Sequence, residues 1–259
     1  MLGSLIGTRK WQWAVRGKHP SVKDYFTLGE DFRLFRAFSD WMEKGYRGLP
    51  SRRPSSKDLL SWRFWAGGME KDNILCGIIK DSSDSVGRPY PLLMAGTGPL
   101  KGWQSRWDRV PDACESVWNQ MELISARMFR DLKQIEGELR GIRHPDPDWL
   151  GLSGNGSGAP EQAVACGKQG AEGAGGAGPA DAGMSGMAAG AEVFVLPDEE
   201  KDYHEMICSC HSFLKARLSE APKTVFVGGY TSRTYLASFR RPLTADDFVR
   251  LWSVGTPGQ

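Results

Sequence analysis

Trp62-Arg63-Phe64-Trp65 and Ile74-Leu75-Cys76-Gly77-Ile78-Ile79 are the two stretches of this sequence that decide its fold. Both are short runs rich in aromatic or β-branched side chains, which favour strands. The residues between them include Gly67-Gly68, a pair typical of a turn. Two strands joined by such a turn predict antiparallel neighbours in a sheet.

Strands and helices are predicted to alternate on both sides of this pair. Upstream, the pattern indicates a strand over Trp11–Val15, turn residues over Lys18–Gly29 and a helix over Glu30–Tyr46. Apolar side chains in that helix recur at three- and four-residue steps, which gives it one apolar face. Downstream, Pro91–Ala95 is predicted to be a strand, and residues 112–140 are predicted to be one long helix with a continuous apolar face.

Residues 151–190 differ in composition from the rest of the chain. They hold 13 of the 32 glycines and 10 alanines, and they contain no aromatic residue. Such a segment buries too little apolar surface to offset the entropy that is lost on ordering. It is therefore predicted to be a flexible linker or an inserted loop. Beyond it, Val193–Leu196 is expected to be a strand, and Asp198 is expected to cap the helix that follows.

The last part of the chain predicts a hairpin and a final short helix. Val225–Val227 and Tyr235–Phe239 are expected to pair around the turn residues Gly228-Gly229-Tyr230-Thr231. Thr244 and Asp247 have the spacing of a capping box, which marks the beginning of a helix.

These patterns together predict a mixed α/β protein with a partly antiparallel sheet flanked by helices. Residues 1–150 are expected to form the main unit, and residues 151–191 the linker or insertion. Residues 192–259 are expected to form a smaller C-terminal α/β part that packs on the first.

Composition argues against several classes of protein. The net charge is +2, so the chain lacks the overall positive field of a protein that binds nucleic acid. No stretch approaches the ~18–20 consecutive apolar residues of a membrane span. The apolar run at the N-terminus is too short for a signal peptide, so a cytoplasmic protein is expected. The five cysteines form no disulfide framework and are expected to be reduced thiols.

Three side chains with metal-binding chemistry share one face of a predicted helix. His204, Cys208 and His211 follow one another at i, i+4 and i+7. Imidazole and thiolate groups are zinc ligands, so this arrangement is a candidate metal site. The spacing is not that of a standard zinc motif, and apolar residues occupy the same helix. Core packing is therefore the favoured interpretation, and no metal or cofactor is predicted.

Asp84 and Arg88 are candidates for charge chemistry. With Asp81 they could form a hydrolytic acid pair or a Mg²⁺ site. The favoured interpretation is a turn, in which the Asp84 side chain accepts backbone N–H groups, Gly87 supplies a flexible φ, and Arg88 pairs with a carboxylate.

Cys76 and Cys114 are candidate nucleophiles, for which His19 or His144 would be the base. Nothing near them in the sequence supports that chemistry, and Cys76 lies in an apolar predicted strand. Core packing is favoured for both thiols.

Four segments occur in a recognisable order. The first, from Trp13 to Phe26, carries Gly17, Lys18, Pro20 and Asp24; the second and third are Trp41-Met42-Glu43-Lys44-Gly45 and Trp62-Arg63-Phe64. The fourth carries, without gaps, Ser82, Asp84, Val86, Gly87, Arg88, Pro91 and Leu92. In this order the segments resemble the TagF (ImpM) family of bacterial type VI secretion. The resemblance is strong over residues 10–100. It departs from the family at Lys23, Asp81 and Tyr90, where glycine, proline and phenylalanine are usual.

The resemblance implies a cytoplasmic regulator that binds other proteins and is not an enzyme. TagF-like proteins repress type VI secretion after translation, and they are linked to a threonine-phosphorylation branch and to a forkhead-associated (FHA) scaffold. The expected partners are therefore type VI secretion components, including such a scaffold, and the motif residues are expected to be structural or partner-binding. Two alternatives stay open. One is a hydrolytic or metal-dependent enzyme that uses Asp84 and Arg88 on a phosphorylated substrate, and the other is a structural subunit of the baseplate.

Overall fold

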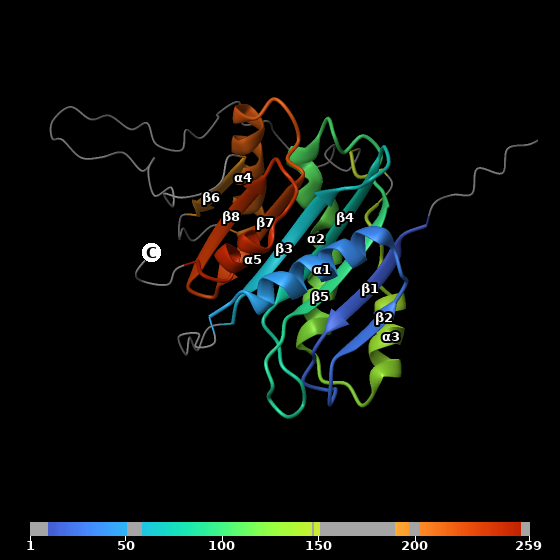
Figure 1. Ribbon diagram of the computed structural model, residues 1–259. Helices are drawn as coiled ribbons and strands as arrows, with labels where there is room; N and C mark the ends of the chain where they lie inside the picture. Colours follow the sequence, from blue (N-terminus) through green and yellow to red (C-terminus); the bar gives the residue numbers. More distant parts are fainter. Residues whose placement is uncertain (1–9, 51–58, 147, 151–189, 197–201, 255–259) are drawn as a thin grey trace, which may run out of the picture.

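The computed structural model describes residues 10–50, 59–146, 148–150, 190–196 and 202–254, and the strands in these ranges form one eight-stranded sheet (Figure 1). The strands are β1 Gln12–Gly17, β2 Phe26–Gly29, β3 Ser61–Gly67, β4 Asn73–Lys80, β5 Leu92–Pro99, β6 Ala191–Val195, β7 Thr224–Tyr230 and β8 Arg233–Phe239. The helices are α1 Arg33–Arg47, α2 Val110–Ala126, α3 Leu132–Arg140, α4 Tyr203–Arg217 and α5 Ala245–Leu251, with a 3₁₀ turn, η1 Trp107–Arg109, before α2. The strand order across the sheet is β2-β1-β5-β4-β3-β7-β8-β6.

The two decisive stretches form the hairpin at the centre of this sheet, as predicted. β3 and β4 pair antiparallel, and Phe64 lies opposite Gly77. Every strand pair among the described residues is antiparallel, so the sheet is more uniform than the partly antiparallel sheet that the sequence predicts. Short connections explain much of this, because a tight loop such as the one joining β7 to β8 returns the chain in the opposite direction.

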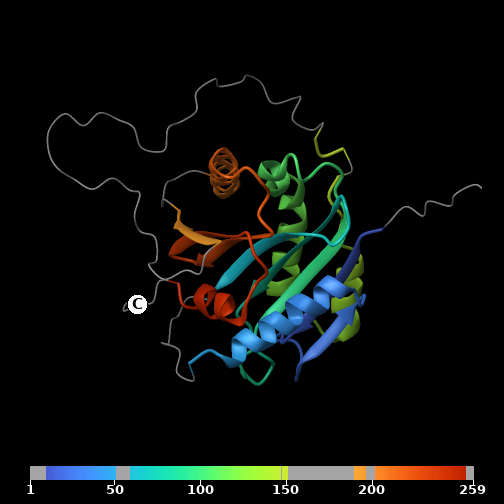
Figure 2. The same cartoon turned by 45° about the horizontal axis from the view of Figure 1, so that its top comes forward.

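Helices cover both faces of the sheet. α1 and α5 pack on one face, and α2, α3 and α4 pack on the other (Figure 2). Neighbouring residues of β3 therefore enter two different cores: Trp62 and Phe64 pack under α1 and α5, whereas Trp65 packs under α2 and α4. Two covered faces explain why β3 and β4 are apolar at nearly every position instead of every second one.

The C-terminal residues continue the same sheet. β7 pairs with β3, with Phe226 opposite Phe64, and β8 and β6 follow outward. The predicted strand near Val193 and the predicted hairpin are thus confirmed. The division of the chain at residues 150 and 192 stays a prediction, and nearly all of the predicted linker, residues 151–189, lies outside the described residues.

The predicted single helix over residues 112–140 is wrong, because two helices occupy this range. Arg127 has an extended backbone (φ −84°, ψ 140°) and ends α2. Asp131 caps α3, and its carboxylate accepts a hydrogen bond from the Gln134 N–H at 3.0 Å. The apolar spacing continues through the break, but Met128 is 68% exposed and contributes nothing to a buried face. None of the described helices is both long enough and apolar enough to cross a membrane.

Replacing Asp131 with alanine is expected to destabilise the protein by about 1 kcal/mol, because the first N–H groups of α3 lose the carboxylate that caps them. Urea unfolding followed by circular dichroism measures this loss. Lys133→Ala changes an exposed residue of the same first turn without touching the cap, and it should stay within about 0.5 kcal/mol of the wild type. Equal losses in the two variants would contradict the capping role.

Two predicted turn regions contain strand residues. The segment Lys18–Gly29 ends in the four-residue strand β2, which pairs with β1. The pair Gly228-Gly229 lies inside β7, opposite Trp62 and Ser61 of β3, and the turn of the hairpin follows two residues later. In both places the residue types are typical of turns, so the sequence pattern does not indicate a strand. The strand forms because a neighbouring strand of the sheet pairs with it.

One predicted helix cap is confirmed and another is wrong. Thr244 and Asp247 form the predicted capping box at the start of α5. The cap of α4 is Asp202, whose carboxylate accepts from the His204 N–H at 2.8 Å, so α4 begins later than the predicted cap at Asp198 implies. Asp198 itself lies outside the described residues.

Candidate functional site

The loop between β4 and β5, residues 82–90, folds around one carboxylate. Oδ1 of Asp84 accepts hydrogen bonds from the main-chain N–H groups of Val86 (3.1 Å) and Arg88 (2.9 Å). Oδ2 accepts from Nε of the Arg88 guanidinium at 2.7 Å. Gly87 has a positive φ of 83° and reverses the chain between these residues. This is the turn that the sequence favours, with Asp84, Gly87 and Arg88 setting its shape.

The segment between β1 and β2 closes over the same carboxylate. Nζ of Lys18 lies 3.0 Å from Oδ2 of Asp84, in a largely buried ion pair. The Arg88 guanidinium in turn extends from the 82–90 loop to the segment between β1 and β2. It donates to the main-chain oxygen of Lys23 at 2.9 Å and lies 3.5 Å from the Asp24 carboxylate. The first and fourth motif segments thus form one unit, which we call the Asp84 cluster: Lys18, Asp24, Asp84 and Arg88.

The carboxyl group of Asp84 is held in its ionised form. Burial alone would raise its pKa, but the hydrogen bonds from Lys18, from Arg88 and from the Val86 N–H outweigh burial and hold the pKa well below its usual range. A carboxylate that is already occupied by these donors is poorly suited to take a proton from a substrate. The geometry therefore favours a structural role for Asp84 over the acid–base role that the enzyme hypothesis requires.

Three further motif residues lie at the edges of this unit. Gly17, at the end of β1, has a φ of +133°, and a Cβ atom built on it would lie 2.1 Å from the main-chain oxygen of Pro91. Ser82 accepts a hydrogen bond from the Tyr90 N–H through its own main-chain oxygen at 3.0 Å. Pro20 is exposed on the segment between β1 and β2. Of these three residues, Gly17 sets how closely the two segments approach each other, because a side chain there would meet the main chain of Pro91.

The outer surface of the 82–90 loop presents apolar and charged side chains to solvent. Val86 is 62% exposed, and more than half of the Arg88 side chain is accessible. Tyr25 is also exposed, and its ring packs edge-on against Tyr90 with the ring centroids 5.3 Å apart. Tyrosine and arginine are the residue types that concentrate binding energy at protein interfaces. Here hydrogen bonds to Asp84 hold Arg88 in place, and the ring contact with Tyr90 holds Tyr25.

Trp41 and Trp62, the remaining motif residues, lie away from the Asp84 cluster in the core under α1 and α5. Nε1 of Trp41 donates to the main-chain oxygen of Thr244 at 2.7 Å, and its ring packs edge-on against Phe248. Trp62 is fully buried in β3. These two residues join α1, α5 and the sheet, and their burial in the core leaves almost no accessible surface for a partner.

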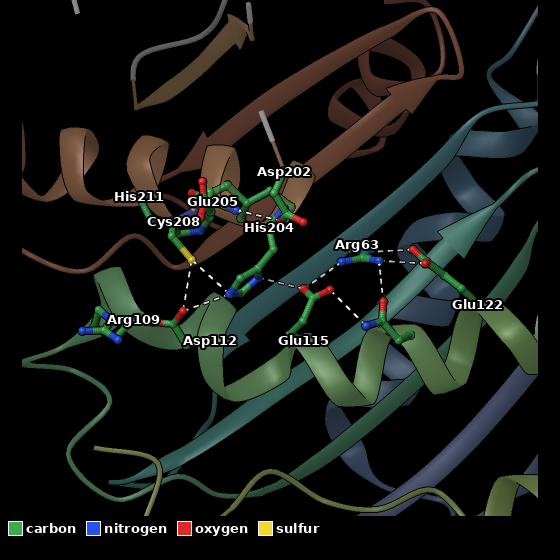
Figure 3. A network of polar contacts seen from close by, with 12 residues as sticks. Arg63, Arg109, Asp112, Glu115, Glu122, Asp202, His204, Glu205, Cys208 and His211 are labelled. Carbon is green, nitrogen blue, oxygen red and sulfur yellow. Dashed lines mark hydrogen bonds and ion pairs between the residues drawn. The ribbon is translucent and has the colours of Figure 1, made fainter. Parts of the chain in front are cut away.

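A second polar cluster lies between α2 and α4 (Figure 3). It begins at Arg63, a buried residue of β3 whose guanidinium donates to Glu115 at 2.9 Å and to both carboxylate oxygens of Glu122 at 2.7 and 2.8 Å. Burial alone would lower the pKa of Arg63, but Glu122 and then Glu115 raise it above the usual range. The charge on Arg63 is thus compensated inside the protein.

From Glu115 the contacts continue to α4. Nδ1 of His204 lies 3.0 Å from Oε2 of Glu115, and Nε2 lies 3.0 Å from Oδ1 of Asp112. Sγ of Cys208 lies 3.2 Å from the same Asp112 oxygen and 3.5 Å from Nε2 of His204. Arg109 pairs with the other oxygen of Asp112. We call Asp112, Glu115, His204 and Cys208 the α2–α4 cluster.

The group of three side chains suggested by helix spacing does not come together, because His211 points elsewhere. His211 is fully buried; its Nδ1–H donates to the main-chain oxygen of Ile207 at 2.8 Å, and its Nε2 accepts from Nε1 of Trp65 at 3.1 Å. His204 and Cys208 meet Asp112 instead. Sequence reasoning missed Asp112 because it lies 92 residues before His204, on another helix.

Cys76 on β4 and Cys114 on α2 are both fully buried in the core between the sheet and α2. The hydrogen bond to Cys76, followed by burial, raises the pKa of the Cys114 thiol well above its usual value. A thiol of this kind forms little thiolate at neutral pH, so the arrangement supports core packing over nucleophilic chemistry.

Comparison with known proteins bears on residues 14–140, which match the model of the TagF N-terminal domain, described as type VI secretion system-associated. These residues form a TagF N-terminal domain. The TagF domain runs from within β1 to the end of α3, so it contains the whole Asp84 cluster and the α2 half of the α2–α4 cluster. His204 and Cys208 lie beyond the TagF domain, on α4.

The crystal structure of PA0076 from Pseudomonas aeruginosa PAO1 aligns with 92% of this chain and 93% of that chain, at 14% sequence identity and a TM-score of 0.48. No curated protein matches the chain.

Proposed function

We propose that this chain represses assembly of the type VI secretion system after translation, by binding components of that system in the cytoplasm, and that it is not an enzyme. The observation that carries the proposal is the match of residues 14–140 to the TagF N-terminal domain, whose description places it with type VI secretion. An FHA scaffold of the secretion machine is the first partner to test. An occupied, buried carboxylate at Asp84 supports binding over catalysis.

The exposed side of the 82–90 loop is the proposed contact surface. Val86 and Arg88 project from a loop whose main chain is fixed by Asp84, and Tyr25 lies nearby on the segment that closes over it. A preorganised loop loses little conformational entropy when it binds, so its exposed side chains contribute more of their contact energy to affinity.

Val86→Asp is expected to weaken binding to the secretion partner by about tenfold, roughly 1.4 kcal/mol, because it places a charge in an apolar contact. The Val86 N–H still donates to Asp84, so the loop should keep its fold. Biolayer interferometry with the purified FHA scaffold, in its phosphorylated and unphosphorylated forms, measures the affinity. An effector-secretion assay in cells shows whether repression is lost with it.

Met69→Asp is the matched control. Met69 is 60% exposed, close to the 62% of Val86, and it lies in the turn at the opposite end of β4. It should bind like the wild type. Equal affinities for the wild type, Val86→Asp and Met69→Asp would exclude the 82–90 loop as the contact surface.

The proposed function as a whole is tested by deleting the gene. The proposal is overturned if secretion and sheath assembly stay unchanged in every growth condition and the purified chain captures no secretion component. Co-purification with baseplate at fixed stoichiometry would instead favour a structural subunit.

A further inference from the structure

The α2–α4 cluster brings three different metal-ligand atoms together. Oδ1 of Asp112, Nε2 of His204 and Sγ of Cys208 all lie within 4.8 Å of one another. Figure 3 shows the sulfur of Cys208 and the imidazole of His204 directed from α4 toward the same carboxylate on α2. We propose that Asp112, His204 and Cys208 bind one divalent transition-metal ion of the zinc type. This inference does not depend on the proposed function.

The distances between the ligand atoms fit a tetrahedral ion. Zinc binds sulfur at about 2.3 Å and nitrogen or oxygen at about 2.0–2.2 Å, so tetrahedral ligands lie about 3.3–3.6 Å apart. The separations here are 3.0 Å for Asp112–His204, 3.2 Å for Asp112–Cys208 and 3.5 Å for His204–Cys208. Shifts of a few tenths of an ångström would accommodate the ion. Three protein ligands leave the fourth position for water or for an exogenous ligand.

A carboxylate behind the imidazole favours the same assignment. Oε2 of Glu115 lies 3.0 Å from Nδ1 of His204, and the Arg63 guanidinium donates to the same oxygen at 2.9 Å. A carboxylate on the far nitrogen is the usual partner of a metal-bound histidine, because it fixes the ring and directs the lone pair of Nε2 at the ion. The guanidinium of Arg109 likewise holds the second oxygen of Asp112, which leaves Oδ1 for the metal.

The donor set indicates which metals would bind. A thiolate and an imidazole select zinc, cobalt and related ions over magnesium and calcium, which prefer oxygen ligands. Binding releases the thiol proton that Cys208 donates to Asp112, because zinc binds the thiolate. This proton passes to solvent and no oxidation occurs, so the affinity for zinc should rise with pH.

A bound ion would connect two distant parts of the chain. Asp112 belongs to the TagF domain, and the other two ligands belong to α4, 92 and 96 residues later. The ion would therefore fasten α4 to the TagF domain. Because it binds only the folded arrangement, it should raise Tm by about 5–10 °C at a zinc concentration roughly a hundredfold above Kd.

The test uses the full chain, from which a chelator has removed any bound metal. Every protein carries Cys166→Ser, so that this thiol, which lies outside the described residues, does not compete for zinc. Zinc titration by calorimetry should give one ion per chain, and Co²⁺ should produce a thiolate charge-transfer band with the visible bands of a tetrahedral ion. Asp112→Asn, His204→Gln and Cys208→Ser should each weaken zinc about a hundredfold or more and, for Cys208→Ser, abolish the charge-transfer band. Glu115→Gln should weaken zinc about 10- to 100-fold while the band is retained.

Cys210→Ser is the matched control, because it removes a thiol from the same helix outside the proposed ligand set, and it should bind zinc within about twofold of the wild type. Circular dichroism in chelator shows that each variant is folded before metal is added. The proposal is overturned if zinc fails to bind saturably at one site, or if the Cys208→Ser and Cys210→Ser proteins bind zinc and cobalt alike.

Discussion

Replacing Gly17 with alanine is expected to destabilise the protein by about 4 kcal/mol or more, enough to prevent folding of a marginally stable chain. Two causes act together. The φ of +133° is a conformation that residues with a side chain rarely adopt, and the new Cβ would lie 2.1 Å from the main-chain oxygen of Pro91. That oxygen is part of the backbone, beside the pairing of Gly17 with Leu92, so relief requires β1 and β5 to separate.

Urea unfolding followed by tryptophan fluorescence measures the loss, and Gly87→Ala is the control that separates the two causes. Gly87 also has a positive φ, of 83°, but a Cβ built there would have no atom within 4 Å. Gly87→Ala should therefore lower the free energy of unfolding only by the cost of the positive φ, about 1–2 kcal/mol. Losses of the same size in both variants would show that the contact with Pro91 contributes nothing.

Stability is expected to fall by about 2 kcal/mol between pH 7 and pH 5 because of His211. Burial lowers the pKa of this imidazole to about 4, and it outweighs the Ile207 main-chain oxygen and the carboxylates of Asp108 and Asp112, which raise it. In the unfolded chain the group titrates near about 6.5. The unfolded state therefore binds the proton first: the contribution is complete above pH 6.5 and is lost as the pH falls toward 4.

A physical cause for the shift is visible in the contacts of the ring. A proton on Nε2 would face the Nε1–H of Trp65, so the hydrogen bond between them would be lost in a fully buried site. His211→Gln keeps an acceptor for Trp65, and it should be less stable at pH 7 but should lose most of the pH dependence between 7 and 5. Burial and Lys80 also lower the pKa of His19, so a smaller slope should remain. A slope in the His211→Gln variant equal to that of the wild type would contradict the assignment.

Much of the fold could be predicted because its signals are local. The capping box of Thr244 and Asp247 lies within four residues, and the two runs that became β3 and β4 carry their own strand preference. The false long helix shows the limit of periodicity: the apolar spacing continues past Arg127, and only the extended backbone there ends the helix. Asp131 with Gln134 three residues later was a usable local signal for the start of α3.

The candidate site was predictable only where it is encoded by neighbouring residues. Asp84, Gly87 and Arg88 form a turn within five residues, so their chemistry indicated it directly. The ion pair with Lys18 depends on the pairing of β1 with β5, which no local pattern encodes. The same holds for Asp112, which meets His204 only because α2 and α4 pack on the same face of the sheet.

The place of β7 beside β3 has a consequence for the TagF domain as an isolated fragment. Residues 14–140 alone would leave Ser61–Ala66 of β3 without the partner that β7 supplies, and with it a row of unpaired N–H and C=O groups beside Trp62 and Phe64. An edge of this kind recruits strands from other molecules. β7 therefore acts as a donor strand from the same chain. It pairs with the edge of β3 and so prevents strands of other molecules from pairing there.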